Sequence, residues 1–119
     1  MLVEWSEFLS LNDTNTDDVP EDAGVYLLWH KLHRDSWRLF YVGNTTNLRT
    51  TLKRHISSSE PDPKIKRKAF NCILGFEYLV HRVTSDREGI VKFLTLNCQP
   101  EHACETTRPG VPPLEINIP

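Results

Sequence analysis

Two tyrosines lie at the ends of short tripeptides that each carry a glycine. Tyr26 ends the tripeptide GVY, and Tyr41 opens the tripeptide YVG. A phenol beside a hydrated metal ion can take or relay a proton from an attacking water, because the metal lowers the pKa of that water. Tyrosines in strands also pack in hydrophobic cores. The two residues therefore fit either a hydrolytic site or an aromatic core.

Basic side chains are concentrated around and after these tyrosines. Residues 31–68 hold ten Lys or Arg and three acids, whereas residues 1–22 hold seven acids and no Lys or Arg. The chain after its acidic start is therefore net basic, although the whole chain has a net charge of −2. A local excess of this kind suits a polyanion such as DNA. A solvated surface with the acidic leader folded across it is the alternative interpretation.

The tyrosines need two strands to position them. Residues 25–32 are rich in β-formers and almost continuously apolar, which predicts a central strand covered on both faces. A polar turn at residues 33–36 and a second β-rich stretch at 37–42 predict an antiparallel hairpin. Apolar residues then recur at helical spacing and predict a helix with one face on the sheet: Leu48, Leu52 and Ile56.

The rest of the chain predicts further elements. Residues 72–83 alternate like a third strand, and residues 85–99 predict a mostly buried helix. Trp5, Phe8 and Leu9 have helical spacing, residues 11–22 are typical of a connector, and residues 64–70 (KIKRKAF) predict a short basic helix. We therefore expect an α/β (α+β) fold with a small three-stranded, mostly antiparallel sheet flanked by helices. Its domain spans residues 23–107, between an acidic leader with a short helix (1–22) and a proline-rich C-terminal arm (108–119).

Length and composition limit the class of protein. At 119 residues the chain suits one domain. No apolar run reaches the ~20 residues that span a bilayer, and no secretory signal opens the chain, so we expect no membrane partner and a cytoplasmic (intracellular) location. An odd number of cysteines without a framework spacing predicts reduced thiols. A zinc set is an alternative, although a buried cysteine at a helix end is the simpler interpretation; its residues would be Cys98, His102 and Cys104 with Cys72 or His81.

The two tripeptides, the short separation between them and the Asn-Leu-Arg helix that follows resemble the GIY-YIG nuclease superfamily, over roughly residues 20–103. Members of this family cut DNA with a metal ion and a tyrosine. The resemblance implies that Tyr26, Tyr41 and Gly43 line the active site, that Mg²⁺ or Mn²⁺ is the cofactor and that DNA is the partner. It also makes His55 a site candidate, because members often carry histidine or tyrosine at this position.

Four positions depart from the family pattern, and one of them is Ala103, where members carry an asparagine. Thr51 stands where members typically carry the catalytic arginine, Val91 where they carry the metal-binding glutamate, and Asn44 where many carry a basic residue after the glycine. Arg54 lies one turn after Thr51 and is the better substitute for a phosphate clamp. Glu88 lies one turn before Val91 and is the nearest metal ligand, although the acid of a capping box is its simpler role.

Three functions remain open. The first is a weakly active or catalytically silent relative of metal-dependent DNA endonucleases that binds nucleic acid. The second is an active structure- or sequence-directed DNA endonuclease with a relocated arginine and glutamate, and the third is a protein-interaction module on the same fold. In the active case the catalytic residues are Tyr26, Tyr41, Arg54 and His55, with Glu88 on Mg²⁺ or Mn²⁺; otherwise no cofactor is expected. The expected nucleic-acid contacts are Gly43, Arg49, Lys53, Lys64, Lys66, Arg67 and Lys68.

Overall fold

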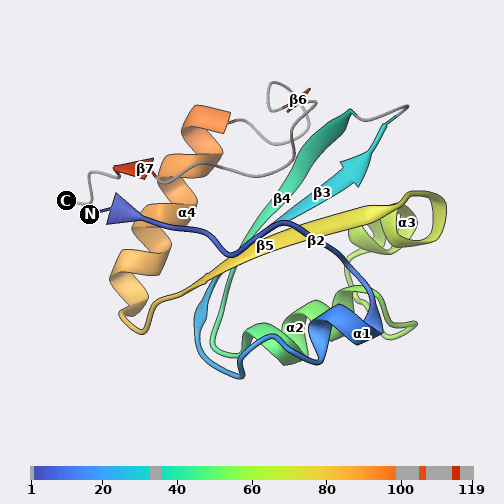
Figure 1. Ribbon diagram of the computed structural model, residues 1–119, viewed down its shortest axis with the longest axis horizontal. Coiled ribbons are helices and arrows are strands. Elements are labelled where there is room, and N and C mark those ends of the chain that lie inside the picture. Colours follow the sequence, from blue (N-terminus) through green and yellow to red (C-terminus); the bar gives the residue numbers. More distant parts are fainter. Residues whose placement is uncertain (1, 33–35, 99–104, 107–113, 116–119) are drawn as a thin grey trace.

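An antiparallel sheet forms the centre of the molecule, in a computed structural model that describes residues 2–32, 36–98, 105–106 and 114–115 (Figure 1). Its long strands lie in the order β5-β3-β4 and are β3 (Gly24–Lys31), β4 (Trp37–Thr45) and β5 (Leu74–Val80). Two-residue strands extend both edges: β2 (Leu9–Ser10) beside β5 and β6 (Glu105–Thr106) beside β4. The α+β class is confirmed. The sheet has five strands rather than three, because strands of two residues are too short to show alternation in the sequence.

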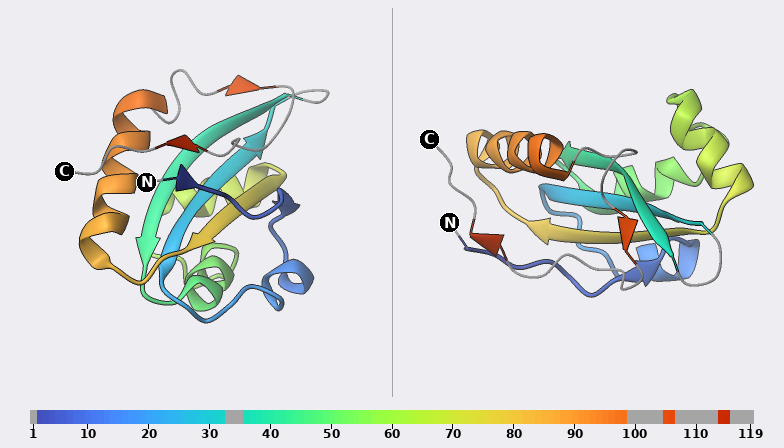
Figure 2. Two further views of the ribbon diagram at one scale, coloured as in Figure 1. Left: turned by 60° about the vertical axis from the view of Figure 1, so that its left-hand side comes forward. Right: turned by 90° about the horizontal axis from the view of Figure 1, so that it is seen from above.

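Helices cover both faces of this sheet, as Figure 1 shows. One face carries α4 (Thr84–Cys98), and the other carries α1 (Asp13–Thr16), α2 (Leu48–His55) and α3 (Pro63–Asn71). A separate antiparallel pair, visible in Figure 2, is formed by β1 (Leu2–Val3) and β7 (Leu114–Glu115). Within the part of the chain that the structure describes, no helix has the length and apolar character needed to cross a membrane.

Strand β3 is the middle strand, as its apolar sequence predicts. Every residue from 24 to 30 is buried, because α2 covers one face of the strand and α4 covers the other. On α2, Leu48 and Leu52 are fully buried against the sheet. Asn47 caps this helix, since its side-chain oxygen accepts the backbone N–H of Thr50 at 3.0 Å. The expected hairpin and helix are therefore confirmed, but the helix ends at His55, so that Ile56 follows it as a partly buried cap residue.

The N-terminal segment differs from the expectation. No helix forms around Trp5 and Phe8; the chain runs alongside β5 instead, and Ser6 donates its backbone N–H to the carbonyl of Tyr78 at 2.8 Å. The Ser6 hydroxyl in turn accepts the Tyr78 N–H at 2.9 Å. These bonds to a distant strand outweigh the weak helical preference of so short a stretch. The expected connector contains α1, which Asn12 caps.

Candidate functional site

Three aromatic rings converge on the α2 face of the sheet. Tyr26 comes from β3, Tyr41 from β4, and His55 from the last turn of α2; their ring centroids lie 5.4 to 5.9 Å apart. A bulge in the β3–β4 pairing makes Phe40 an extra residue on β4, so that Phe40 and Tyr41 both pack against the cluster on this face. The bulge therefore turns Tyr41 toward Tyr26. Of the four expected catalytic residues, the structure brings these three rings into contact.

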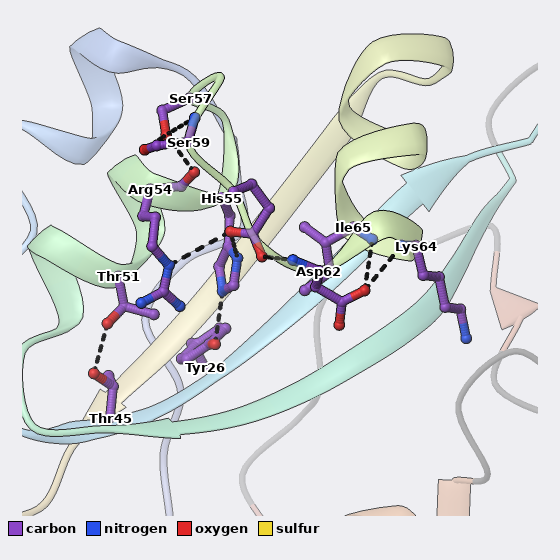
Figure 3. A network of polar contacts seen from close by, with 11 residues as sticks. Tyr26, Thr45, Thr51, Arg54, His55, Ser57, Ser59, Asp62, Lys64 and Ile65 are labelled. Atoms are coloured by element: carbon purple, nitrogen blue, oxygen red, sulfur yellow. Dashed lines mark hydrogen bonds and ion pairs between the residues drawn. The ribbon is translucent and has the colours of Figure 1, made fainter.

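A buried hydrogen-bond chain joins two of the rings to a carboxylate (Figure 3). The Nδ1 atom of His55 lies 2.8 Å from Oε2 of Glu60, and its Nε2 atom lies 2.7 Å from the Tyr26 hydroxyl. Because a carboxylate can only accept, Nδ1 carries the ring proton and donates it to Glu60. The Nε2 atom then accepts the O–H of Tyr26. The result is a Tyr-His-Glu relay with a neutral imidazole at its centre.

Burial sets the proton affinities in this relay. Tyr26 is 2 % exposed, and this burial, followed by the neighbouring Tyr41, raises the pKa of its phenol well above the ordinary value. Burial also lowers the pKa of His55, against a smaller opposing effect of Glu60. Tyr26 therefore stays protonated at neutral pH, which makes it a hydrogen-bond donor rather than a base.

Glu60 is a site residue that the sequence did not reveal. Its side chain is 1 % exposed, and its second oxygen accepts the backbone N–H of Asp62 at 3.1 Å. Asp62 itself caps α3 through the backbone N–H groups of residues 64 and 65. Glu60 thus ties the end of α2, through His55, to the start of α3, through Asp62; both of these residues are labelled in Figure 3. A possible signal was its place among the few acids of a strongly basic stretch.

Gly43, the glycine of the second tripeptide, is required by the Tyr26 ring. A Cβ atom at this position would collide with the hydroxyl end of that ring. The resemblance assigns Gly43 to the active-site lining. The contact shows in addition that its missing side chain gives the buried phenol its space.

The arginine candidates are engaged within the protein. Arg54 is about half exposed, and its Nε atom lies 3.5 Å from the Glu60 carboxylate. Thr51, at the position of the family's arginine, is buried, and its hydroxyl lies 2.6 Å from that of Thr45. A guanidinium is therefore close to the three rings, but the buried carboxylate already holds it.

The donor atoms do not fit a divalent cation beside the tyrosines. Glu88 is exposed on α4, the helix on the opposite face of the sheet from Tyr26 and Tyr41. Among the described residues, no group of three or more His, Cys, Asp or Glu side chains could hold a metal. Glu60 is near the rings, but its oxygens are already engaged by the contacts given above. The structure therefore does not bring Glu88 to the expected site.

A buried cation, Arg87, occupies the face of the sheet covered by α4. It is 3 % exposed and donates to Oδ1 of Asn44 at 2.6 Å and to the backbone carbonyls of His81 and Arg82 at 3.0 and 2.9 Å. Sequence reasoning missed this residue, because a lone arginine in a first helical turn carries no pattern. Asn44, which replaces a basic residue of the family, thus anchors a guanidinium from α4.

Gly43, an expected nucleic-acid contact, is buried beside the Tyr26 ring, and the other six expected contacts fall into two groups. On α2, Arg49 pairs with Glu21 at 3.2 Å and Lys53 pairs with Asp17 at 2.5 Å, so that acids of the leader cover these cations. The other group lies on α3, where three side chains are exposed and one is half-buried: Lys64, Lys66, Arg67 and Lys68.

The alternative zinc set is described only in part. His102 and Cys104 lie outside the described residues, as does the side chain of Cys98. Cys72 is a half-buried free thiol. His81 lies 2.8 Å from the carboxylate of Asp86.

The sheet order, the helix after the second tyrosine and the paired tyrosines define a GIY-YIG-like domain. No protein-family model and no curated protein matches the chain. Its structure is similar to that of the GIY-YIG N-terminal endonuclease domain of UvrC from Thermotoga maritima, a point mutant bound to its catalytic divalent cation. The TM-score is 0.55 and the identity 19 %, over 74 % of this chain and 89 % of that one. The GIY-YIG-like fold expected from the tripeptides is confirmed.

Proposed function

We propose that this chain is a nucleic-acid-binding domain with a GIY-YIG-like fold, and that its metal-dependent cleavage of DNA is weak or absent. The observation that carries the proposal is the composition of α3. Four of its nine residues are basic and none is acidic, and Lys64, Lys66 and Arg67 are exposed. A helix of this kind neutralises phosphates and releases their counterions. The proposal also includes a cytoplasmic location, where nucleic acid is present.

The weak catalysis follows from the way the candidate groups are used. Arg54 faces a buried carboxylate, Thr51 is bonded to Thr45, and Glu88 lies on the opposite face of the sheet from the rings. Loss of a transition-state phosphate clamp costs roughly 10² to 10⁵ in rate. The hydroxyl of Tyr26 is also engaged by Nε2 of His55, and burial raises the pKa of this phenol further above its ordinary value. The relay then serves mainly to fix α2 against β3.

A binding experiment tests the first half of the proposal. Fluorescence anisotropy with a labelled DNA duplex, repeated over a range of salt concentrations, should give a steep fall in affinity, by about 0.9 log units per log unit of salt for each neutralised phosphate. Lys66→Glu combined with Arg67→Glu should weaken binding on the order of tenfold or more. The matched control is Arg82→Glu with Lys92→Glu, two exposed cations of which the first precedes α4 and the second lies on α4. A flat salt response, or equal loss in both double variants, contradicts DNA binding through α3.

A cleavage experiment tests the second half. Nicking of supercoiled DNA is measured with Mg²⁺ and with Mn²⁺ for the wild type, for Tyr41→Phe and for Thr51→Arg combined with Val91→Glu. We expect little or no nicking by the wild type or by either variant, because a carboxylate at position 91 also lies on α4, on the opposite face of the sheet from the rings. Wild-type nicking that Tyr41→Phe abolishes would contradict the proposal, and Arg54 and Glu88 would then be mutated next.

The protein-interaction module makes a different prediction. It would show no salt-sensitive binding to DNA, because its partner would not be a dense polyanion. The anisotropy series therefore separates this alternative from both nucleic-acid functions.

A further inference from the structure

We propose that α3 binds an unpaired nucleotide of a single-stranded nucleic acid. A phosphate is held by the basic stripe of Lys64, Arg67 and Lys68, and a base stacks on Phe70. This inference rests on the proposed nucleic-acid function, and it specifies the kind of nucleic acid and the surface that selects it.

The basic stripe lines a hollow of about 390 Å³ on one side of α3. Its walls come from consecutive turns of the helix and from the residue after it: Lys64, Arg67, Lys68, Asn71 and Cys72. Three cations and an amide meet there, and no acid contributes to the walls. Lys68 is also placed over the Phe40 ring and near His30, which orients its ammonium group. A phosphate, which has only acceptor oxygens, matches this set of donors.

A second hollow, of about 320 Å³, adjoins the first. Arg67 and Asn71 line both hollows, while Pro63, Lys66 and Phe70 complete the second. Phe70 is 89 % exposed. Its ring also borders a third hollow, beside Ser57 and Ala69. The cationic hollow therefore lies next to a flat aromatic ring with open space on more than one side.

This pairing of charge and ring favours a single strand over other partners. A duplex keeps its bases stacked inside and presents phosphates, so that it would use the cations and leave the ring in water. An unpaired strand offers a phosphate and a free base face within one nucleotide, and base-aromatic stacking tolerates any base. A single exposed apolar side chain is ordinary on a protein surface. Phe70 differs because it lines one hollow together with Lys66 and Arg67 and borders another.

The experiment compares a short labelled oligo-dT strand with a duplex of the same length, by anisotropy at one salt concentration. Phe70→Ala and Phe70→Leu should weaken binding of the single strand about fivefold or more, because stacking contributes roughly 5- to 150-fold per base. Phe70→Trp should preserve or strengthen it. Binding of the duplex should stay within about twofold in all three variants. Leu96→Ala, which removes another exposed apolar side chain, on α4, is the matched control and should change neither affinity.

An abasic strand isolates the contribution of the base. It keeps the phosphates and has nothing to stack, so Phe70→Ala should not alter its binding, whereas Lys66→Glu with Arg67→Glu should weaken it. Phe70→Leu that binds oligo-dT like the wild type would overturn the stacking inference, as would equal losses on strand and duplex. A poly-glutamate peptide that binds as tightly as oligo-dT would assign the surface to an acidic protein instead. Duplex binding without any preference for the single strand overturns this inference alone, whereas no binding to either nucleic acid overturns the proposed function.

Discussion

Glu60 lies in the connection between α2 and α3. Its replacement by alanine should destabilise the protein far more than a substitution in a surface connection usually does. The carboxylate is 1 % exposed and accepts two N–H groups, from the ring of His55 and from the backbone of Asp62. Leaving a buried donor without an acceptor costs about 1–3 kcal/mol. His55 is fully buried, but the Asp62 N–H is only partly buried and water can reach it. We therefore expect a loss of about 2–4 kcal/mol for Glu60→Ala, a large share of the 5–15 kcal/mol typical of a domain.

The isosteric change Glu60→Gln separates charge from hydrogen bonding. The amide oxygen still accepts one N–H, and the lost ion pair with Arg54 is worth about 0–1 kcal/mol, because that guanidinium is about half exposed. We expect a loss of about 1 kcal/mol for this variant. Urea unfolding followed by tryptophan fluorescence measures both losses, with unchanged m-values as the sign that the folded state is intact.

Two comparisons decide whether the reasoning holds. Glu88→Ala removes an exposed carboxylate and should stay within about 0.5 kcal/mol of the wild type. His55→Gln together with Glu60→Ala should destabilise less than the sum of the single changes, because the two residues share one bond. Additive losses, or a Glu60→Ala variant as stable as Glu88→Ala, would refute the relay as a structural link.

The remaining predictions concern pH, charge and packing. Burial lowers the folded-state pKa of His55, so below about pH 6.5 the unfolded chain takes up a proton that the folded chain does not. Stability should therefore fall as the pH falls below about 6.5, by at most about 1.4 kcal/mol per pH unit, and His55→Gln should make this fall less steep. Asp17→Asn with Glu21→Gln should strengthen DNA binding severalfold at low salt, because the leader acids no longer pair with cations of α2; an unchanged affinity would make the leader irrelevant to binding. Gly43→Ala should lower the free energy of unfolding by roughly 2 kcal/mol or more, and with it the thermal midpoint, because the new Cβ collides with the Tyr26 ring. A midpoint equal to that of the wild type would show that the ring moves aside freely.

The double variant Asp17→Asn with Glu21→Gln replaces a simpler test, which is the deletion of the acidic leader. Deleting the acidic leader would remove more than its charges, because β2 pairs with β5 and both Val3 and Val19 are buried in the core. A deletion would confuse loss of folding with gain of binding. Neutral substitutions keep the packing and change only the electrostatics.

The sequence predicts those parts of the fold that depend on local pattern. An uninterrupted apolar run gives the middle strand, and the spacing of Leu48 and Leu52 gives the covering helix, because both patterns follow from which side chains face the core. The prediction is wrong where a distant partner decides. Ser6 bonds to Tyr78, far along the chain, and this bond replaces the expected helix.

The residues of the candidate site also differ in whether a local sequence pattern predicts their place. Tyr26, Tyr41 and His55 are placed by strands and a helix that the pattern predicts, so their convergence could be anticipated. Arg87 acts through Asn44, which is distant along the chain. Glu60 contacts His55 and Asp62, which are near it in sequence, but its place between two helices leaves no periodic pattern that would mark it. The ion pair between Arg54 and the buried carboxylate of Glu60 likewise exists only in the folded chain.

The two tripeptides that carry the family resemblance are explained here by packing. A Cβ at Gly24 would meet the backbone of Leu79 and the side chain of Leu48, just as one at Gly43 would meet Tyr26. Tyr26 in turn is held by His55. None of these contacts needs a metal or a phosphate, so the tripeptides predict the fold whether or not the chain cuts DNA. Positions 51 and 91, where the resemblance implies an arginine and a glutamate, are the informative ones for activity, and this chain has a buried threonine and an apolar valine there.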